Sequence, residues 1–123
     1  MKDEAEQPAF DLRVRTKDFA LLIVKMFVAL PRTEEASVLG MQALRSGTSV
    51  GANFREAHRA RSNAEFGAKV GDSLKQLEET SYWLELLTES KIVPADKLSA
   101  LQDECHQLLA ILTSISKKLK ARD

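Results

Sequence analysis

Proline is the residue that most reliably ends a helix, and this chain of 123 residues contains three, Pro8, Pro31 and Pro94. They leave two long intervals in which a helix can continue unbroken. Aromatic residues make up only 6% of the chain and there are 5 glycines, whereas a β-sandwich or barrel needs many aromatic, β-branched and turn residues. The length fits a single domain. The sequence therefore predicts one all-α domain.

Capping signals divide the proline-free intervals into four helices. Ser62 and Glu65 have the spacing of a capping box, in which each side chain accepts a hydrogen bond from an unpaired N–H at a helix start. Thr33 before two acidic residues, and Pro94 before an amphipathic segment, are also typical helix starts. The predicted helices span residues 16–30, 33–61, 63–90 and 95–120. Short connections favour an antiparallel up-down-up-down four-helix bundle at 16–123, after an N-terminal extension at 1–15.

Residues repeated at steps of three and four predict which face of each helix points to the core. On the last helix these are Leu98, Leu101, Cys105, Leu108, Leu112, Ile115 and Leu119. On the third they are Phe66, Val70, Leu74, Leu77, Ser81, Leu84 and Thr88. On the first they are Phe19, Leu22, Ile23, Met26, Phe27 and Leu30. The second helix has a stripe of mostly small residues, namely Leu39, Ala43, Ser46, Val50, Asn53, Ala57 and Ala60.

Glycines are concentrated beside that small stripe, at Gly40, Gly47 and Gly51. Each glycine inside a helix costs about 1 kcal/mol relative to alanine. Their presence predicts either a close approach of another helix backbone or a kink near residues 47–51. Gly67 and Gly71 repeat the spacing on the third helix, where we expect tight packing within the subunit.

The sequence offers little catalytic chemistry. Asp103 and His106 have one ligand-like spacing, but the further carboxylates and histidines of a di-metal bundle site are missing. Cys105 is expected in the core, and phosphate-loop, nucleophile-elbow and zinc-helix motifs do not occur. We therefore predict a non-enzymatic protein with no catalytic residue, no metal and no cofactor.

Basic residues are concentrated in the first half of the chain, although 18 basic and 18 acidic residues balance overall. Residues 12–62 hold 9 basic and 4 acidic side chains. Arg45, Arg55 and Arg59 fall within an arc of about 80° on the second helix. They form a candidate nucleic-acid-binding face. The other interpretation is an ordinary solvated helix surface.

A second candidate surface lies on the third helix. Glu78, Glu85 and Glu89 fall within about 40° of one another. Tyr82, Trp83 and Leu86 lie outside the predicted inner stripe and add apolar area. Aromatic residues beside a charged rim are typical of subunit interfaces, so these six residues form a candidate interface of a homo-oligomer. Peripheral packing inside the subunit is the alternative.

Three segments resemble one known family. They are residues 39–57, LGMQALRSGTSVGANFREA, residues 61–66, RSNAEF, and residues 78–87, EETSYWLELL, together with Lys69. This pattern is similar to the signature of the bacterial four-helix-bundle family called the 23S rRNA intervening-sequence proteins. The resemblance runs from Arg15 to the last helix. It implies a four-helix subunit, often a homopentamer around a central channel, without an established enzymatic activity. Distant relatives are accessory proteins of diversity-generating retroelements, which work with a reverse transcriptase and nucleic acid.

Two hypotheses for function remain open at this point. In the first, a ring of copies presents the helix-two arginines to RNA or another polyanion. In the second, the protein is a structural adaptor for a protein partner, and the arginines make subunit contacts. A cytoplasmic location without a membrane partner is expected, because the start of the chain lacks a secretory signal and the apolar stretch at 19–30 is too short to span a bilayer. No small-molecule substrate is indicated.

Overall fold

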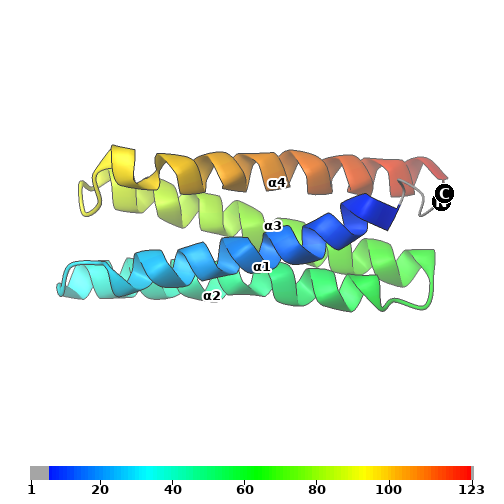
Figure 1. Cartoon of the computed structure of the whole chain (residues 1–123), viewed down its shortest axis with the longest axis horizontal. Coiled ribbons are helices and arrows are strands. Elements are labelled where there is room, and N and C mark those ends of the chain that lie inside the picture. Colours follow the sequence, from blue (N-terminus) through cyan, green and yellow to red (C-terminus); the bar gives the residue numbers. More distant parts are fainter. Residues whose placement is uncertain (1–5, 123) are drawn as a thin grey trace.

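The computed structural model of the chain describes the backbone of residues 6–122 and the side chains of residues 12–121. Over this range the fold is all-α, with no strand. The four helices are α1 (Glu6–Val28), α2 (Glu34–His58), α3 (Asn63–Glu89) and α4 (Ala95–Arg122). In Figure 1 the connections between consecutive helices lie alternately at the two ends of an elongated molecule. Among the helix pairs that touch, contact is most extensive between α2 and α3 and least extensive between α1 and α4.

The first helix begins at Glu6 rather than at the predicted residue 16. Pro8 is the third residue of α1. The first N–H groups of a helix have no intrahelical partner, so a proline there removes no hydrogen bond. The predicted start of the first helix at residue 16 was therefore wrong. The added turns matter for packing, because Leu12 is buried.

The predicted capping signals are confirmed. Thr33 Oγ1 accepts a hydrogen bond from the Ala36 N–H at 3.2 Å and caps α2. Ser62 Oγ accepts from the Glu65 N–H at 3.0 Å and caps α3. The Glu65 carboxylate reaches back and accepts from the Arg61 N–H at 2.7 Å. Both donors are terminal N–H groups that the helix itself leaves unpaired, so the two side chains define where α3 starts.

The inner face of α4 is confirmed, whereas the inner face of α3 is rotated from the prediction. Five of the seven predicted α4 residues are buried, and Ile115 and Leu119 are half-buried. On α3 the buried set is Val70, Ser73, Leu77, Thr80, Leu84 and Leu87. Small side chains on α2 let α3 approach closely, and hydroxyl groups join the two helices there. The Ser46 and Thr80 hydroxyls are 2.7 Å apart, and Ser73 Oγ donates to the Val50 carbonyl at 2.8 Å.

The glycines of α2 form the surface on which α1 rests. A Cβ atom built on Gly47 would lie 2.8 Å from Ile23 Cγ1, and one on Gly51 would lie 3.3 Å from Thr16 Oγ1. Gly40 lies against the side chains of Leu30 and Phe27. A Cβ on Gly51 would also lie 3.4 Å from the Thr16 carbonyl carbon, so the predicted close approach of a helix backbone is confirmed there, whereas Gly40 and Gly47 meet side chains.

The prediction for the two α3 glycines is wrong within this chain. A Cβ on Gly71 would meet nothing within 4 Å, and one on Gly67 would meet only Leu119 Cδ1, at 3.6 Å.

Leu22, which was predicted to point inward, is 45% exposed. It lies at the edge of α1 that faces α4, where these two helices have little contact.

Candidate functional site

The three predicted arginines divide between two parts of the surface. Arg45 Nη2 lies 2.8 Å from Glu79 Oε1 on α3, and its guanidinium also contacts Gln42 and Gln76. Arg55 and Arg59 instead line a groove with residues of α1. The single basic face predicted from the helical wheel is therefore not one surface in the structure.

The groove between α1 and α2 brings four cationic side chains together. It has a volume of about 540 Å³ and is lined by Arg13, Val14, Lys17, Asp18, Arg55 and Arg59. Asp18 is the only acidic residue in this lining. Because α1 extends back to Glu6, it places a second basic pair beside the end of α2. Sequence reasoning missed the pair of Arg13 and Lys17, although its two residues are four positions apart, as Arg55 and Arg59 are.

Guanidinium and ammonium groups gathered in this way suit phosphate oxygens. Arginine offers up to two parallel hydrogen bonds to one phosphate, and lysine acts as a compact point charge. Arg55 also has a structural role, since it lies in the last turn of α2, where a cation interacts favourably with the helix dipole. The four charges are supplied by two helices, however, and the dipole of α2 does not account for Arg13 and Lys17.

A neighbouring ion pair joins α2 to α3 outside the groove. Lys69 Nζ lies 2.8 Å from Glu56 Oε1. The hydrogen bond and charge of Lys69 lower the pKa of Glu56, and the same contact raises the pKa of Lys69. Glu56 is thus directed toward α3, and it does not line the groove of Arg55 and Arg59.

The six residues of the candidate oligomer interface lie on the outer part of α3. Glu78, Tyr82, Glu85 and Glu89 are exposed, whereas Trp83 and Leu86 are half-buried. The Tyr82 and Trp83 rings have centroids 5.1 Å apart and planes inclined by 60°. Among the described side chains, the buried Trp83 Nε1 has no hydrogen-bond acceptor. The role of this surface in assembly remains a prediction.

A further exposed surface, on α1, was not found from the sequence. Four aliphatic side chains, which we call the α1 stripe, point away from the core: Val14, Leu21, Val24 and Val28. Val28 is the most exposed, at 76%. Val38 and Met41 of α2 are also exposed large apolar residues. The signal was present in the sequence, because Val14, Leu21 and Val28 are seven residues apart, which brings them to one side of a helix.

Cys105 is a core residue, as predicted. Its thiol is buried and lies 3.7 Å from the Leu77 carbonyl oxygen. Burial raises its pKa to about 12. Asp103 and His106 are both exposed. Within the described part of the chain, no three His, Cys, Asp or Glu residues are grouped in a way that could hold a metal ion.

The described residues define a class of all-α protein, in which four long helices carry a basic groove and an apolar outer stripe. Residues 10–114 match the family model described as 23S rRNA-intervening sequence protein, and the chain belongs to this family. The resemblance noted in the sequence is therefore confirmed.

One similar solved structure is a protein of unknown function from the S23 ribosomal protein family of Bacteroides thetaiotaomicron VPI-5482. It is 35% identical to this chain, with a TM-score of 0.83. The similarity covers 89% of this chain and 97% of the other. The search of curated proteins found no match. Over the residues described, no helix combines the length and apolar character needed to cross a membrane.

Proposed function

We propose that this chain is a non-enzymatic protein that folds as an antiparallel four-helix bundle. Copies of the bundle assemble with one another, and the assembly binds RNA or a similar polyanion. The observation that supports this most directly is the α1–α2 groove, where Arg13, Lys17, Arg55 and Arg59 surround a single carboxylate, Asp18. Phosphate groups of a nucleic-acid backbone are the ligands that such a set of donors suits. Arg45 is left out of the proposed site, because it is paired with Glu79.

One groove alone would give weak binding that depends strongly on salt. Each neutralised phosphate contributes about 0.7 to the slope of log affinity against log salt for a single strand. The groove lining has no aromatic residue on which a base could stack. Backbone contact should therefore dominate, and sequence selectivity should be low.

Assembly would multiply this weak contact by raising the effective concentration of grooves along one strand. Two surfaces support self-association: the apolar α1 stripe, and the acidic and aromatic surface of α3 around Tyr82. A patch of exposed apolar residues is typical of a protein contact site. The family resemblance adds five as the proposed number of copies.

The test is to titrate fluorescently labelled structured RNA at two salt concentrations and follow its anisotropy. A variant with Arg55→Ala and Arg59→Ala should bind more weakly and reduce the salt slope by about 1 to 2. The matched control carries Lys117→Ala and Lys118→Ala, which removes the same charge from exposed positions on α4. If both double variants weaken binding equally, RNA does not bind specifically in the groove. Unchanged binding by the arginine variant would also contradict RNA binding there.

The alternative function is an adaptor for a protein partner, and the exposed α1 stripe favours it. In that case Arg55 and Arg59 contact an acidic surface of another subunit, such as that of Glu78 and Glu85. Arg59→Glu should then dissociate the assembly, whereas it should leave the assembly intact if the arginine faces RNA. Light scattering coupled to size-exclusion chromatography measures the mass in each case and separates the two functions.

A further inference from the structure

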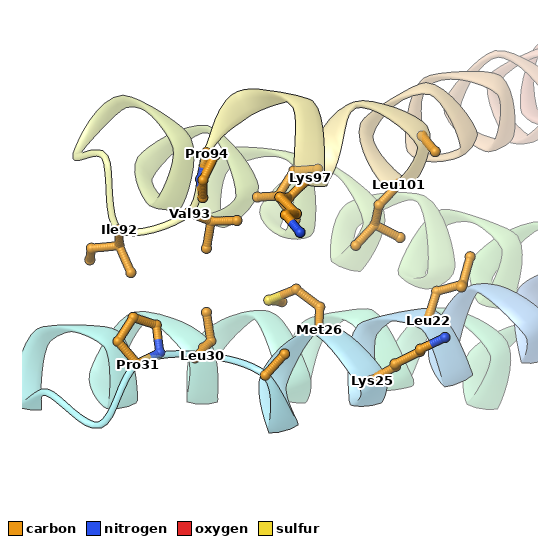
Figure 2. Close-up of a pocket in the computed structure, with 13 residues that line it drawn as sticks. Leu22, Lys25, Met26, Leu30, Pro31, Ile92, Val93, Pro94, Lys97 and Leu101 are labelled. Atoms are coloured by element: carbon orange, nitrogen blue, oxygen red, sulfur yellow. The ribbon is translucent and has the colours of Figure 1, made fainter.

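A second groove lies between α1 and α4, at the end of the bundle where the α3–α4 connection is found. Figure 2 shows Leu22 and Met26 of α1, with Leu30 just after this helix, facing Val93 and Leu101 across the groove. Its volume is about 560 Å³, which is within the range of roughly 300–1,000 Å³ for small-molecule sites. The groove explains why Leu22 is 45% exposed although it lies on the side of α1 that faces α4.

The charges around this groove have one sign. Lys25 and Lys97 are its only charged lining residues, and no carboxylate lines it. In Figure 2 the Lys97 side chain points from α4 toward α1, and Lys25 lies beside Leu22 at the edge. The C-terminal end of α1 and the N-terminal end of α4 meet here, so their helix dipoles oppose each other. The two lysines therefore provide the net positive charge at the site.

The lining of the groove favours a hydrocarbon chain with an anionic head. Eleven of its thirteen lining residues are apolar, and the other two are Lys25 and Lys97. Apolar side chains stabilise a hydrocarbon tail by removing it from water, and a lysine ammonium group pairs with a carboxylate.

From this apolar lining and the lysine pair, we propose that the α1–α4 groove binds a free long-chain carboxylate. The hydrocarbon tail lies between Met26 and Leu101, and the carboxylate lies within reach of Lys97 and Lys25. This site is separate from the basic α1–α2 groove and shares none of its lining residues. It does not depend on the proposed RNA binding.

The first experiment titrates the full chain with octanoate, decanoate and dodecanoate by isothermal calorimetry at concentrations where none forms micelles. Each buried methylene should raise the affinity about four-fold, so decanoate should bind about 15-fold more tightly than octanoate. Decyltrimethylammonium has a tail of the same length with a positive head. It should bind much more weakly than decanoate, and equal binding would overturn the role of the lysines.

Substitutions in the lining of the α1–α4 groove test whether the ligand binds there. Ala100 is exposed and lines the groove, so Ala100→Phe should fill the space and abolish dodecanoate binding without disturbing the core. Ala110→Phe, at an exposed position on α4 outside this groove, is the matched control and should bind as the wild type does. Lys97→Met keeps the stem of the side chain, removes its charge, and should weaken binding about five-fold.

Three results with the ligand series and its variants would overturn the proposal: no binding at any chain length, equal binding by the Ala100 and Ala110 variants, or an affinity that does not change with chain length. Binding of dodecanoate only when the protein is diluted to a monomer would also overturn it, because a second copy would then occupy the groove in the assembled protein. Thermal unfolding of each variant, followed by circular dichroism, establishes that it is folded. If Ala100→Phe fails to fold, Ala29→Phe tests the opposite wall at another exposed position.

Discussion

Ile23 lies against Gly47 so closely that a Cβ on the glycine would be 2.8 Å from Ile23 Cγ1. This contact places a fully buried α1 side chain directly on the α2 backbone. A glycine in mid-helix costs about 1 kcal/mol relative to alanine. The close packing of Ile23 offsets that cost, and it fixes how near α1 comes to α2.

Replacing Gly47 by alanine should therefore destabilise the protein, although alanine is the better helix former. The added methyl group would force Ile23 to move in a packed core, at a cost of about 1–3 kcal/mol. Gly71→Ala is the matched control, because a Cβ there meets nothing within 4 Å. It should stabilise the protein by up to about 1 kcal/mol. Urea unfolding measures both, and equal stabilisation by the two substitutions would show that α1 does not rest on Gly47.

The hydroxyl pair of Ser46 and Thr80 should couple energetically. Their oxygens are 2.7 Å apart in the core between α2 and α3. Ser46→Ala and Thr80→Val should each destabilise the protein by about 1 kcal/mol. Since each substitution removes the same hydrogen bond, the double variant should lose less than the sum of the two. A double-mutant cycle of unfolding free energies measures this, and strict additivity would mean that the bond contributes nothing.

The parts of the fold that the sequence predicted depend on local chemistry. The cap at Ser62 and the buried seam from Leu98 to Leu112 follow from side chains a few residues apart on one helix. The rotation of α3 depends instead on the small residues of α2, and a single-helix pattern cannot include that neighbour. Apolar periodicity favoured Leu74, whereas the hydroxyl of Ser73 reaches the Val50 carbonyl and is buried.

The same limit applied to the candidate site. A helical wheel placed Arg45 with Arg55, but the partner of each arginine is determined by the helix beside it. Arg45 meets Glu79 of α3, whereas Arg55 meets the α1 surface that carries Arg13 and Lys17. Arg13 was assigned to the N-terminal extension at 1–15, and Lys17 of the predicted first helix was not placed beside the second helix. The contact between α1 and α2, which a single-helix pattern cannot include, therefore determines half of the groove.

Lys91 is the only described non-glycine residue with a positive φ, at 66°. Lys91 follows the C-cap of α3, in a turn where the Val93 N–H donates a hydrogen bond to the Leu87 carbonyl at 3.1 Å. Glycine adopts this left-handed conformation without the Cβ clash that other residues suffer. Lys91→Gly should raise the unfolding free energy by about 1 kcal/mol. Lys91→Ala removes the same charge but keeps the Cβ, and should give little change. Thermal unfolding compares them, and equal stability of the two variants would contradict strain at this turn.

The buried Cys105 thiol should make the native protein slow to react with thiol reagents and sensitive to alkali. Its pKa is raised to about 12 from the ordinary value of 9.0, mainly because burial disfavours the thiolate. A folded pKa above the unfolded one means that the unfolded chain loses its thiol proton first as pH rises. This contribution to stability is therefore fully present below pH 9 and is lost between about pH 9 and 12.

Two measurements check this behaviour of Cys105. A chromogenic disulfide reagent at pH 8 should label the native protein far more slowly than the protein in guanidinium chloride, with a native rate that increases as urea promotes opening. The loss of unfolding free energy between pH 9 and 11 should be smaller in Cys105→Ala, which has no thiol to ionise, although this variant is less stable at neutral pH because it leaves a small cavity. Rapid native labelling, or the same alkaline loss in both proteins, would show that the thiol is accessible to solvent.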